Sequence, residues 1–358
     1  MNTQITLVIN NMLTEAAKQK ASDIHLLRGS KPVLRIDHKL VEMGAADILT
    51  EEFLQDFLKV VLNEKEQADL QEKKVVKTVY VLEGKVRFRV SAHFQKGGLS
   101  VGLKLINPRV HSLDDLNLGS NFKKLASFNE GLIVLSGPYN SGKSTILAAV
   151  IEEINRTKNK NIVTIEDPVE YIFINDKSII EQRQVGRDVN SFLEGIEQCR
   201  DEDVDVVVVT GSDGPHIIQP IVDMASSGRL VFFVTDSVSV IHTLERILAA
   251  FPAAQQQRAR EMLAETLVSI CSFRLLSRST GSGGALAYGM LFSNASVQSL
   301  LRDGKIAQLI TSMQTSQAEG MITLDQQLFM LVQQGVITPE VALEEAVDKN
   351  NLRAKLRG

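Results

Sequence analysis

Residues 131–145 read GLIVLSGPYNSGKST, and this stretch decides the fold of the second half of the chain. GLIVLSG is short and almost continuously apolar, which predicts a strand covered on both faces. Residues 137–144 match the spacing G-x-x-x-x-G-K-S, and the TILAAVIEEI that follows has the apolar pattern of a helix. A strand, a glycine loop and a helix in this order predict a loop whose backbone N–H groups bind phosphate.

The loop supplies the predicted nucleotide-binding residues. Lys143 would neutralise the β- and γ-phosphates of ATP or ADP, and Ser144 would place its hydroxyl on Mg²⁺. Tyr139 and Asn140 occupy positions where bulk can crowd the phosphates, although Asn tolerates a positive φ better than most residues. An ordinary glycine turn is the alternative interpretation. The predicted set is Gly137, Pro138, Tyr139, Asn140, Ser141, Gly142, Lys143, Ser144 and Thr145.

Composition narrows the class of protein. The chain has 358 residues, which is more than one hydrophobic core usually supports, so two domains are expected. Its 39 Lys and Arg against 43 Asp and Glu, without a long basic run, make nucleic acid an unexpected partner. Cys199 and Cys271 lack the spacing of a zinc or disulfide framework, which favours the cytoplasm. No apolar run is long enough for a membrane span, so a soluble, unexported protein is expected.

Hydrophobic periodicity predicts two domains of different class. Residues 1–105 predict an α+β domain with an initial helix, a hairpin interrupted at residues 29–32, a helix in LTEEFLQDFLKVVL, and strands in VVKTVYVLE and KVRFRVSAHFQ. Residues 106–120, beginning INPRVHSLDDLNLG, predict a linker. Residues 121–358 predict an α/β domain, because GLIVLSG, NIVTIED, DVDVVVVTG and GRLVFFVT have the composition of buried strands and alternate with helical patterns.

Further segments carry a resemblance to a known family. They are ASDIHL (21–26), TIEDPVEY (164–171), QRQV (182–185), SVQSLLRD (296–303) and MITLDQQLFMLVQQG (321–335). Together with the phosphate loop they resemble the PilT-like motor ATPases of type IV pili, within the type II/IV secretion ATPase superfamily, over nearly the whole chain. The resemblance implies a PAS-like N-terminal domain and a RecA-like P-loop domain with a helical C-terminal region.

The resemblance also implies partners and an activity. It implies a hexamer in which the N-terminal domain packs on the neighbouring RecA-like domain, with ATP and Mg²⁺ between them. The ring would be a homo-hexamer or a mixed ring with a PilT-like ATPase, and it would dock on a pilus platform protein at the inner membrane. The implied activity is retraction of a type IV pilus, as in twitching motility.

The acidic box TIEDPVEY supplies the catalytic candidates. It places Glu166 and Glu170 at and just beyond the end of a predicted strand, where a solvated turn is the alternative interpretation. By the resemblance, Glu170 orients or deprotonates the attacking water, a role that needs a carboxylate within hydrogen-bond reach. Glu166 is the second catalytic candidate, and Asp205 is the second predicted Mg²⁺ ligand beside Ser144.

The sequence departs from the family at several functional positions. Thr210 and Gly211 stand where the resemblance implies a Gly-Glu pair acting on Mg²⁺ and water, and neither residue can hold a metal-bound water in that way. Arg229 and Asp236 of GRLVFFVTDS stand where histidines are implied.

Arginines of the family are also replaced. Lys104 stands at the position of an arginine that reaches the neighbouring nucleotide, whereas Arg87 and Arg89 of RFRV remain as nucleotide-binding candidates. Gln298 replaces another arginine, within SVQSLLRD.

These departures predict a nucleotide-binding chain with impaired hydrolysis, because each lost transition-state group typically costs ~10² to 10³ in rate. One alternative is an active motor in which Asp213 or Asp236 compensates. Another is a scaffold with a vestigial loop blocked by Tyr139. Since the family carries a side chain at the position of Gly211, we expect that position to accept one. Gly211→Glu with Asp236→His should then raise phosphate release.

Overall fold

The computed structural model describes residues 3–36, 39–44, 46–82, 84, 86–106, 110–211, 214–281 and 283–357. The chain divides into two compact units. The N-terminal unit is Met1–Arg109 with Pro168–Ile172, and the C-terminal unit is Val110–Asp167 with Phe173–Gly358. The C-terminal unit differs from the predicted domain of residues 121–358, because it starts at Val110 and lacks Pro168–Ile172, which contains four residues of the acidic box.

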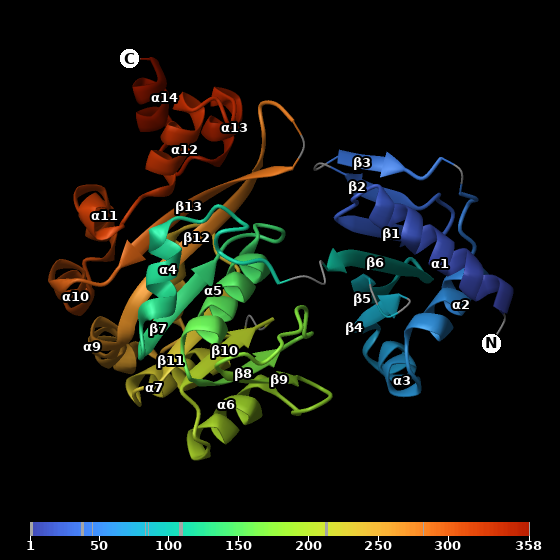
Figure 1. The fold of residues 1–358 in the computed structure, drawn as a ribbon, viewed down its shortest axis with the longest axis horizontal. Coiled ribbons are helices and arrows are strands. Elements are labelled where there is room, and N and C mark those ends of the chain that lie inside the picture. The colour runs from blue at the N-terminus through green and yellow to red at the C-terminus, as the bar shows by residue number, and fades with distance from the viewer. Residues whose placement is uncertain are drawn as a thin grey trace. The chain divides into compact units, whose positions relative to one another are not determined.

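The N-terminal unit is built on one antiparallel sheet with the strand order β3-β2-β1-β6-β5-β4. Two of its helices, α2 and α3, have N-terminal caps formed by side chains. Thr50 accepts the N–H of Phe53 at 3.1 Å, and Asn63 forms a reciprocal capping box with Glu66. Helix α2 packs on β6 and α3 packs on β4 (Figure 1). The elements are α1 (Thr3–Lys18), β1 (Asp23–Leu27), β2 (Val33–Ile36), β3 (Lys39–Glu42), α2 (Glu51–Val61), α3 (Glu64–Lys73), β4 (Val75–Leu82), β5 (Val86–Gln95) and β6 (Gly98–Ile106).

This arrangement confirms the α+β class predicted for the first domain. β1 and β2 form the predicted antiparallel hairpin, and the core gathers apolar side chains from the sheet and from α1 and α2. The Lys/Glu-rich segment after α2, for which no element was predicted, forms α3. Of the predicted linker, residues 107–109 lie outside the described residues, and Leu113 is fully buried in the core of the C-terminal unit.

The C-terminal unit is built on a seven-stranded sheet with the order β13-β12-β7-β11-β10-β8-β9. Only the β12–β13 pair is antiparallel among the described pairings. The four apolar runs of the sequence form β7, β8, β10 and β11, which confirms the α/β class. The strands are β7 (Gly131–Ser136), β8 (Asn161–Glu166), β9 (Ile179–Gln184), β10 (Val206–Thr210), β11 (Leu230–Thr235), β12 (Leu267–Ser277) and β13 (Gly284–Phe292).

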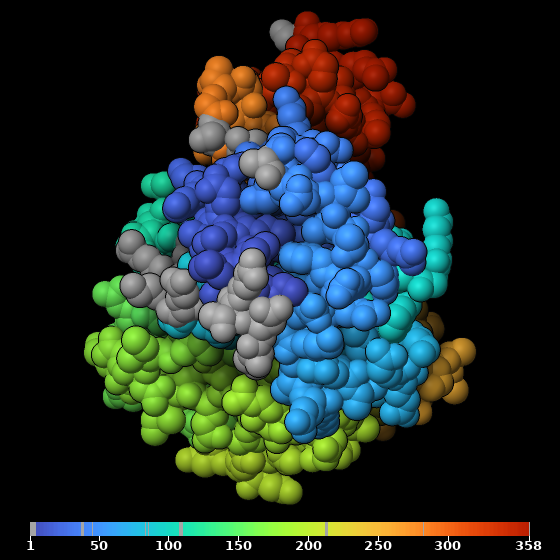
Figure 2. Space-filling model, turned by 90° about the vertical axis from the view of Figure 1, so that its right-hand side faces the viewer, coloured from blue at the N-terminus to red at the C-terminus, as the bar shows by residue number. Residues whose placement is uncertain are grey.

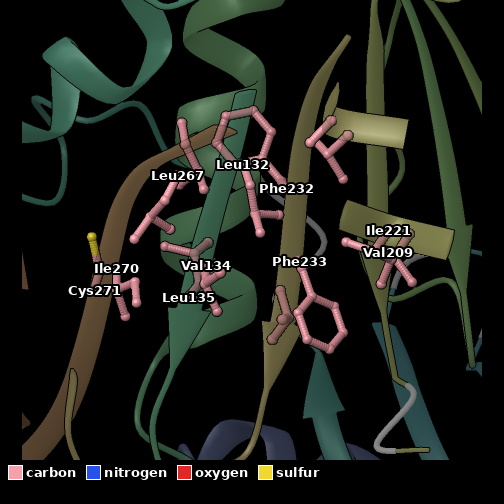
Figure 3. Packing of buried hydrophobic residues seen from close by; sticks show 14 of the residues in the cluster. Leu132, Val134, Leu135, Val209, Ile221, Phe232, Phe233, Leu267, Ile270 and Cys271 are labelled. Carbon is pink, nitrogen blue, oxygen red and sulfur yellow. The ribbon is translucent and has the colours of Figure 1, made fainter. Parts of the chain in front are cut away.

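The central strands are buried on both faces. All six residues of β7 and all six of β11 are buried, as expected for parallel strands covered by helices. Figure 3 shows Leu132 of β7, Phe232 of β11 and Ile270 of β12 in this core. The helices are α4 (Ser120–Ser127), α5 (Lys143–Thr157), α6 (Phe192–Asp201), α7 (Ile218–Ser226), α8 (Val240–Ala249), α9 (Gln256–Thr266), α10 (Ala295–Arg302), α11 (Leu309–Thr315), α12 (Leu324–Gln333), α13 (Pro339–Glu345) and α14 (Lys349–Arg357), with 3₁₀ turns Pro215–Ile217, Ala253–Gln255, Ile306–Gln308 and Gln317–Glu319.

The last three helices form a separate apolar cluster within the C-terminal unit. Leu324 and Leu328 of α12 pack with Leu276 of β12 and Ala287 of β13. Figure 2 shows these helices (red) beside the tip of the β12–β13 hairpin (orange). The helical C-terminal region is thus attached to the outer edge of the sheet.

Parallel register brings the ends of four strands to one edge of this sheet. Ser136 of β7 pairs with Thr235 of β11, and Thr210 of β10 pairs with Glu166 of β8. β11 and β10 are themselves paired in parallel. We call the edge where these strands end the carboxyl edge, and the opposite one the amino edge. The loops that follow β7, β11, β10 and β8 therefore start side by side at the carboxyl edge. Open α/β sheets bind their ligands at this edge.

Candidate nucleotide site

The phosphate loop follows β7 at the carboxyl edge and has the backbone conformation that its glycines allow. Gly137 has φ +151°, and a Cβ there would lie 2.5 Å from Ser141 Oγ and 2.7 Å from the carbonyl oxygen of Phe273. Asn140 has φ +63°, in the left-handed region that Asn tolerates. Gly142, with φ +90°, leads into α5. Glycine or asparagine therefore stands at each loop position where the backbone has a positive φ.

The start of the loop is anchored by buried hydroxyls. Thr243 of α8 donates its Oγ1 hydrogen to Ser136 Oγ at 2.9 Å, and Ser136 donates to the carbonyl oxygen of Cys271 at 3.2 Å. Ser136 and Thr243 are both 0% exposed. The last residue of β7 is consequently fixed to β12 on one side and to α8 on the other.

The loop fits a nucleotide's phosphates. Ser141 Oγ is buried and finds no hydrogen-bond partner among the described residues, so a donor is left for a ligand oxygen. The first N–H groups of α5 have no partner within the helix, and the helix dipole favours an anion at this end. Lys143, Ser144 and Thr145 form the first turn of α5, which places all three beside these N–H groups.

Lys143 is paired with an acid that the sequence did not connect to it. Its Nζ lies 2.9 Å from Oδ1 of Asp236, and it also donates to the carbonyl oxygens of Gly137 at 2.7 Å and Pro138 at 2.8 Å. The side chain of Lys143 is 12% exposed, whereas that of Asp236 is 67% exposed. The lysine is therefore folded back on its own loop, and its charge is neutralised by a carboxylate that can move into solvent.

Gly211 corrects one expectation. It follows β10 with φ +96°, and a Cβ there would lie 2.4 Å from the carbonyl oxygen and 2.9 Å from the nitrogen of Asp167. The N–H of Asp167 donates to the carbonyl oxygen of Thr210 at 3.2 Å, which holds the two segments together. The expectation that Gly211 accepts a side chain is wrong, because the clash is with backbone and the φ itself disfavours L residues. The compensating residue predicted at Asp213 lies outside the described residues.

Asp205 is not placed to bind a metal with Ser144. It precedes β10 at the amino edge, where its carboxylate is 2.8 Å from Lys160 Nζ and accepts the N–H of Asn161 at 2.9 Å. The five residues of β10 span about 16 Å, far longer than any Mg²⁺–oxygen bond. Partial burial alone would raise the pKa of Asp205, but Lys160 and the N–H of Asn161 hold it below its ordinary value. The predicted metal role of Asp205 is therefore corrected to a structural ion pair.

Arg229 also lies at the amino edge, immediately before β11. Its guanidinium donates to the carbonyl oxygens of Arg200 at 3.0 Å and Glu202 at 3.3 Å. The two positions matched to histidines thus separate: Asp236 contacts the phosphate loop, and Arg229 lies at the other end of the same strand.

Glu166 ends β8 at the carboxyl edge, but its carboxylate is already engaged. Glu166 is 7% exposed and accepts hydrogen bonds from Thr164 at 2.6 Å and from Gln182 at 3.1 Å. Two strands, β11 and β10, separate β8 from β7, a distance of about 14 Å at ordinary strand spacing. The structure thus does not bring Glu166 together with Lys143.

Glu170 is held by the two arginines predicted to bind nucleotide. Arg89 lies 3.1 Å from Oε1 of Glu170. Arg87 donates to the carbonyl oxygens of Glu170 at 2.6 Å and Val169 at 3.0 Å. These contacts belong to the N-terminal unit, and Glu170 is 9% exposed there. The guanidinium groups therefore fix the conformation of the acidic segment in their own chain.

The remaining predicted positions have simple places in the fold. Lys104 of β6 lies opposite Arg89 of β5. Gln298 lies in α10, where its N–H donates to Asn294. The Tyr139 side chain is 60% exposed, so it does not fill the phosphate loop.

Comparison with known proteins identifies the family. A family model described as type II/IV secretion system protein matches residues 2–337. The chain is 33% identical over 338 residues to the type IV pilus retraction ATPase PilT of Pseudomonas aeruginosa. The aligned region covers 94% of this chain and 98% of that protein. The chain belongs to the PilT-like family of type II/IV secretion ATPases.

Two further comparisons support membership of the PilT-like family. The twitching motility protein of Neisseria gonorrhoeae is 32% identical over 97% of this chain and 93% of its own length. A crystal structure of the pilus retraction motor PilT with bound ADP matches with a TM-score of 0.83 and 34% identity, over 97% of this chain and 99% of that one. The resemblance carried by the sequence segments and the fold class are therefore confirmed.

Proposed function

We propose that this PilT-like chain is a ring protein of type IV pilus retraction and twitching motility that binds ATP or ADP with Mg²⁺ and hydrolyses ATP poorly. Its similarity to pilus retraction ATPases over nearly its whole length supports the pilus system. The observation that carries the second part is Gly211. Its backbone leaves no room for the carboxylate that the family resemblance implies at the end of β10.

Nucleotide binding is supported by the phosphate loop. The N–H groups of residues 137–145 and the Lys143 ammonium would hold the phosphates, and Ser144 would hold Mg²⁺. The bound metal would supply neutralisation of phosphate charge. Lys143 must first leave Asp236 and the carbonyl oxygens of its own loop. Such a partly exposed ion pair is weak, so this step lowers nucleotide affinity without preventing binding.

Weak turnover is supported by the state of the carboxylates. A general base must lie within hydrogen-bond reach of the attacking water. Glu170, the best candidate by the resemblance, is paired with Arg89, and Glu166 is bonded to Thr164 and Gln182. These contacts hold Oε1 of each acid in place, so that oxygen would have to exchange its partners before it could act on a water, and we expect this to raise the barrier to hydrolysis.

Assembly is proposed by analogy with the family. The ring would be a homo-hexamer or a mixed ring with a PilT-like ATPase, docked on the inner-membrane platform protein of the pilus from the cytoplasmic side. Arg87 and Arg89 would reach a neighbouring nucleotide only by exchanging their contacts with Val169 and Glu170 for phosphate. Within the described part of the chain, no helix combines the length and apolarity of a membrane span.

The test is to measure ADP affinity by calorimetry and phosphate release on the same purified sample. We expect Mg²⁺-dependent ADP binding with phosphate release well below a motor-like rate of order 1 s⁻¹. Lys143→Ala should abolish binding, and Lys305→Ala, which removes an exposed lysine paired with Asp303, should leave it unchanged. Mass photometry with nucleotide should detect a six-membered ring. Release at motor-like rates, or no nucleotide binding, would contradict the proposal.

A second candidate is an active motor in which Asp236 replaces a lost ligand, and the contact between Asp236 and Lys143 is the observation that favours it. In that case Asp236→Asn should abolish phosphate release. Under our proposal there is little release to lose, and the same change should tighten ADP binding. The exposure of Tyr139 argues against the third possibility, a scaffold whose loop is blocked by that side chain.

A further inference from the structure

Strand β12 runs past the end of β7 and lies beside the start of the phosphate loop. Ser272 of β12 pairs with Ser136, the last residue of β7. The next residue of β12 is Phe273, and its carbonyl oxygen would lie 2.7 Å from a Cβ added at Gly137, the first residue of the loop. The backbone of Phe273 therefore packs directly against the loop, and a group that fixes this carbonyl also fixes the surface against which the loop lies.

Arg274, the next residue of β12, holds this carbonyl in place. Its Nη1 donates to the carbonyl oxygen of Phe273 at 2.9 Å, and its Nη2 donates to the carbonyl oxygen of Val238. Arg274 is 8% exposed, so its guanidinium is almost entirely withdrawn from water. A buried charged group is tolerated only where protein groups replace its hydrogen bonds to water, so Arg274 depends on these two carbonyls.

Val238 lies in residues 236–239, the segment between β11 and α8 that also contacts the phosphate loop. Asp236, two residues before Val238, carries the carboxylate that lies 2.9 Å from Nζ of Lys143. One hydrogen bond of Arg274 therefore fixes the strand beside the start of the phosphate loop, and the other fixes the segment that carries the partner of Lys143. The two segments that border the proposed phosphate site are joined through one side chain.

The charge of Arg274 is balanced by Glu345, the last residue of α13. Nε of Arg274 lies 3.0 Å from Oε2 of Glu345. The Glu345 side chain is 40% exposed, whereas that of Arg274 is 9% exposed. Removing the partner of a buried charge is more disruptive than removing one member of an exposed pair. A contact made by the helical C-terminal region therefore acts on a group that borders the phosphate site.

We propose that Arg274 is a positioning residue for nucleotide binding, and that Glu345 makes the affinity for nucleotide depend on the helical C-terminal region. The inference rests on the proposed function, because it takes residues 137–145 as the phosphate site. Arg274 acts through the carbonyl groups of Phe273 and Val238 and not through contact with phosphate. Glu345 keeps the guanidinium in the orientation that serves both carbonyls.

The first experiment compares Arg274→Lys with wild type. Lysine keeps the charge beside Glu345 but lacks the planar fork, so it cannot hold both carbonyl oxygens. Without nucleotide, we expect amide hydrogen exchange in residues 137–142 and 236–239 to become faster on the order of ten-fold. Calorimetry with ADP and Mg²⁺ should show an affinity lower by about three- to ten-fold. A folded Arg274→Lys with the exchange rates or the ADP affinity of wild type would overturn the proposal.

The second experiment tests the contribution of α13. Glu345→Gln keeps the shape and an acceptor oxygen but removes the charge that balances Arg274, so ADP affinity should fall by about two- to five-fold. Glu344→Gln, which changes an exposed acid of the same helix, should bind ADP as wild type does. If Glu345 were only structural, denaturation would show lower stability while ADP affinity stayed unchanged, and that result would contradict the proposal. Should Arg274→Lys not fold, Glu345→Gln decides.

The outcomes separate this inference from the proposed function. Absence of ADP binding in wild type would overturn the proposed function, and with it the dependence of affinity on Glu345. The exchange rates without nucleotide would still decide whether Arg274 orders residues 137–142 and 236–239. Normal ADP binding in wild type, with unchanged exchange and unchanged affinity in Arg274→Lys and Glu345→Gln, would overturn this inference alone.

Discussion

The ammonium of Lys143 and the carboxylate of Asp236 lie 2.9 Å apart. The two residues are 93 positions apart in the chain, yet the strands that precede them, β7 and β11, are neighbours in register. The lysine that we propose to bind phosphate therefore has an anionic partner within its own chain. Any phosphate that binds must compete with this carboxylate.

Asp236→Asn should tighten ADP binding, because it removes the competing charge and leaves a side chain of the same shape. The expected gain in affinity is about two- to five-fold, the range of partly exposed ion pairs. Calorimetry at low and high salt measures it, and the gain should shrink as salt screens the pair. Asp303→Asn, which removes an exposed acid in the same unit, is the control. Weaker or unchanged binding in Asp236→Asn would mean that the pair does not compete with phosphate.

Gly211→Ala should lower the free energy of unfolding by about 2–4 kcal/mol, from a left-handed φ and a backbone clash together. Gly186→Ala separates the two causes, because Gly186 has φ +81° and no atom within 4 Å of a Cβ added there. Chemical denaturation of both variants gives the difference. Equal losses of stability would show that the approach of Asp167 to Gly211 is not a constraint.

The double variant Gly211→Glu with Asp236→His is expected to lose stability and to release no more phosphate than wild type. The introduced glutamate meets the backbone of Asp167 before it can reach a metal or a water. Phosphate release and thermal melting on the same preparation test this. A folded double variant with strongly raised release would restore the expectation drawn from the sequence.

Asp205→Asn should lower stability slightly at pH 7, by up to about 1 kcal/mol, and leave Mg²⁺-dependent ADP affinity unchanged. The folded-state pKa of Asp205 lies below its ordinary value, so the ionised pair with Lys160 stabilises the fold above the unfolded pKa. That contribution is lost as pH falls through the folded pKa. Denaturation curves of variant and wild type should therefore converge below about pH 4. A loss of Mg²⁺-dependent affinity would instead place Asp205 in the metal site.

Arg87→Ala should speed amide hydrogen exchange in residues 169–172 on the order of ten-fold, because two hydrogen bonds to carbonyl oxygens of that segment are lost. Arg87→Lys keeps the charge but not the fork that reaches both oxygens, so its exchange rate should be intermediate. Arg353→Ala in α14 is the control. Identical exchange in wild type and Arg87→Ala would mean that the guanidinium does not order the acidic segment.

The sequence predicted what local pattern determines. The apolar runs that end at Ser136, Glu166 and Thr210 form strands, as predicted. Each run is short, rich in β-branched residues and almost continuously apolar, which is the pattern of a strand covered on both faces. The phosphate loop was equally clear, since its glycines and lysine have a fixed spacing. The order of the strands is not written in any local pattern, so the meeting of Lys143 with Asp236 was not predicted.

The wrong metal role of Asp205 has a simple physical cause. Asp205 lies before β10 at the amino edge, whereas the phosphate loop lies at the carboxyl edge. Which end of a parallel strand a residue occupies decides whether it can meet the phosphate loop. Pro168–Ile172 groups with the N-terminal unit, where Arg87 donates to the carbonyl oxygens of Val169 and Glu170. Hydrogen bonds to backbone carbonyls leave no pattern in the sequence, so this grouping was not predicted.

The left-handed backbone at Gly211 also bears on how this chain can change over generations. A carboxylate could be accommodated at position 211 only if the backbone of Asp167 moved as well, because the carbonyl oxygen of Asp167 lies 2.4 Å from where a Cβ would be. A change of one codon would therefore not be enough, and a second change in the Asp167 segment would be needed beside it. Under the proposed function, a return to full hydrolysis thus requires at least two coupled substitutions.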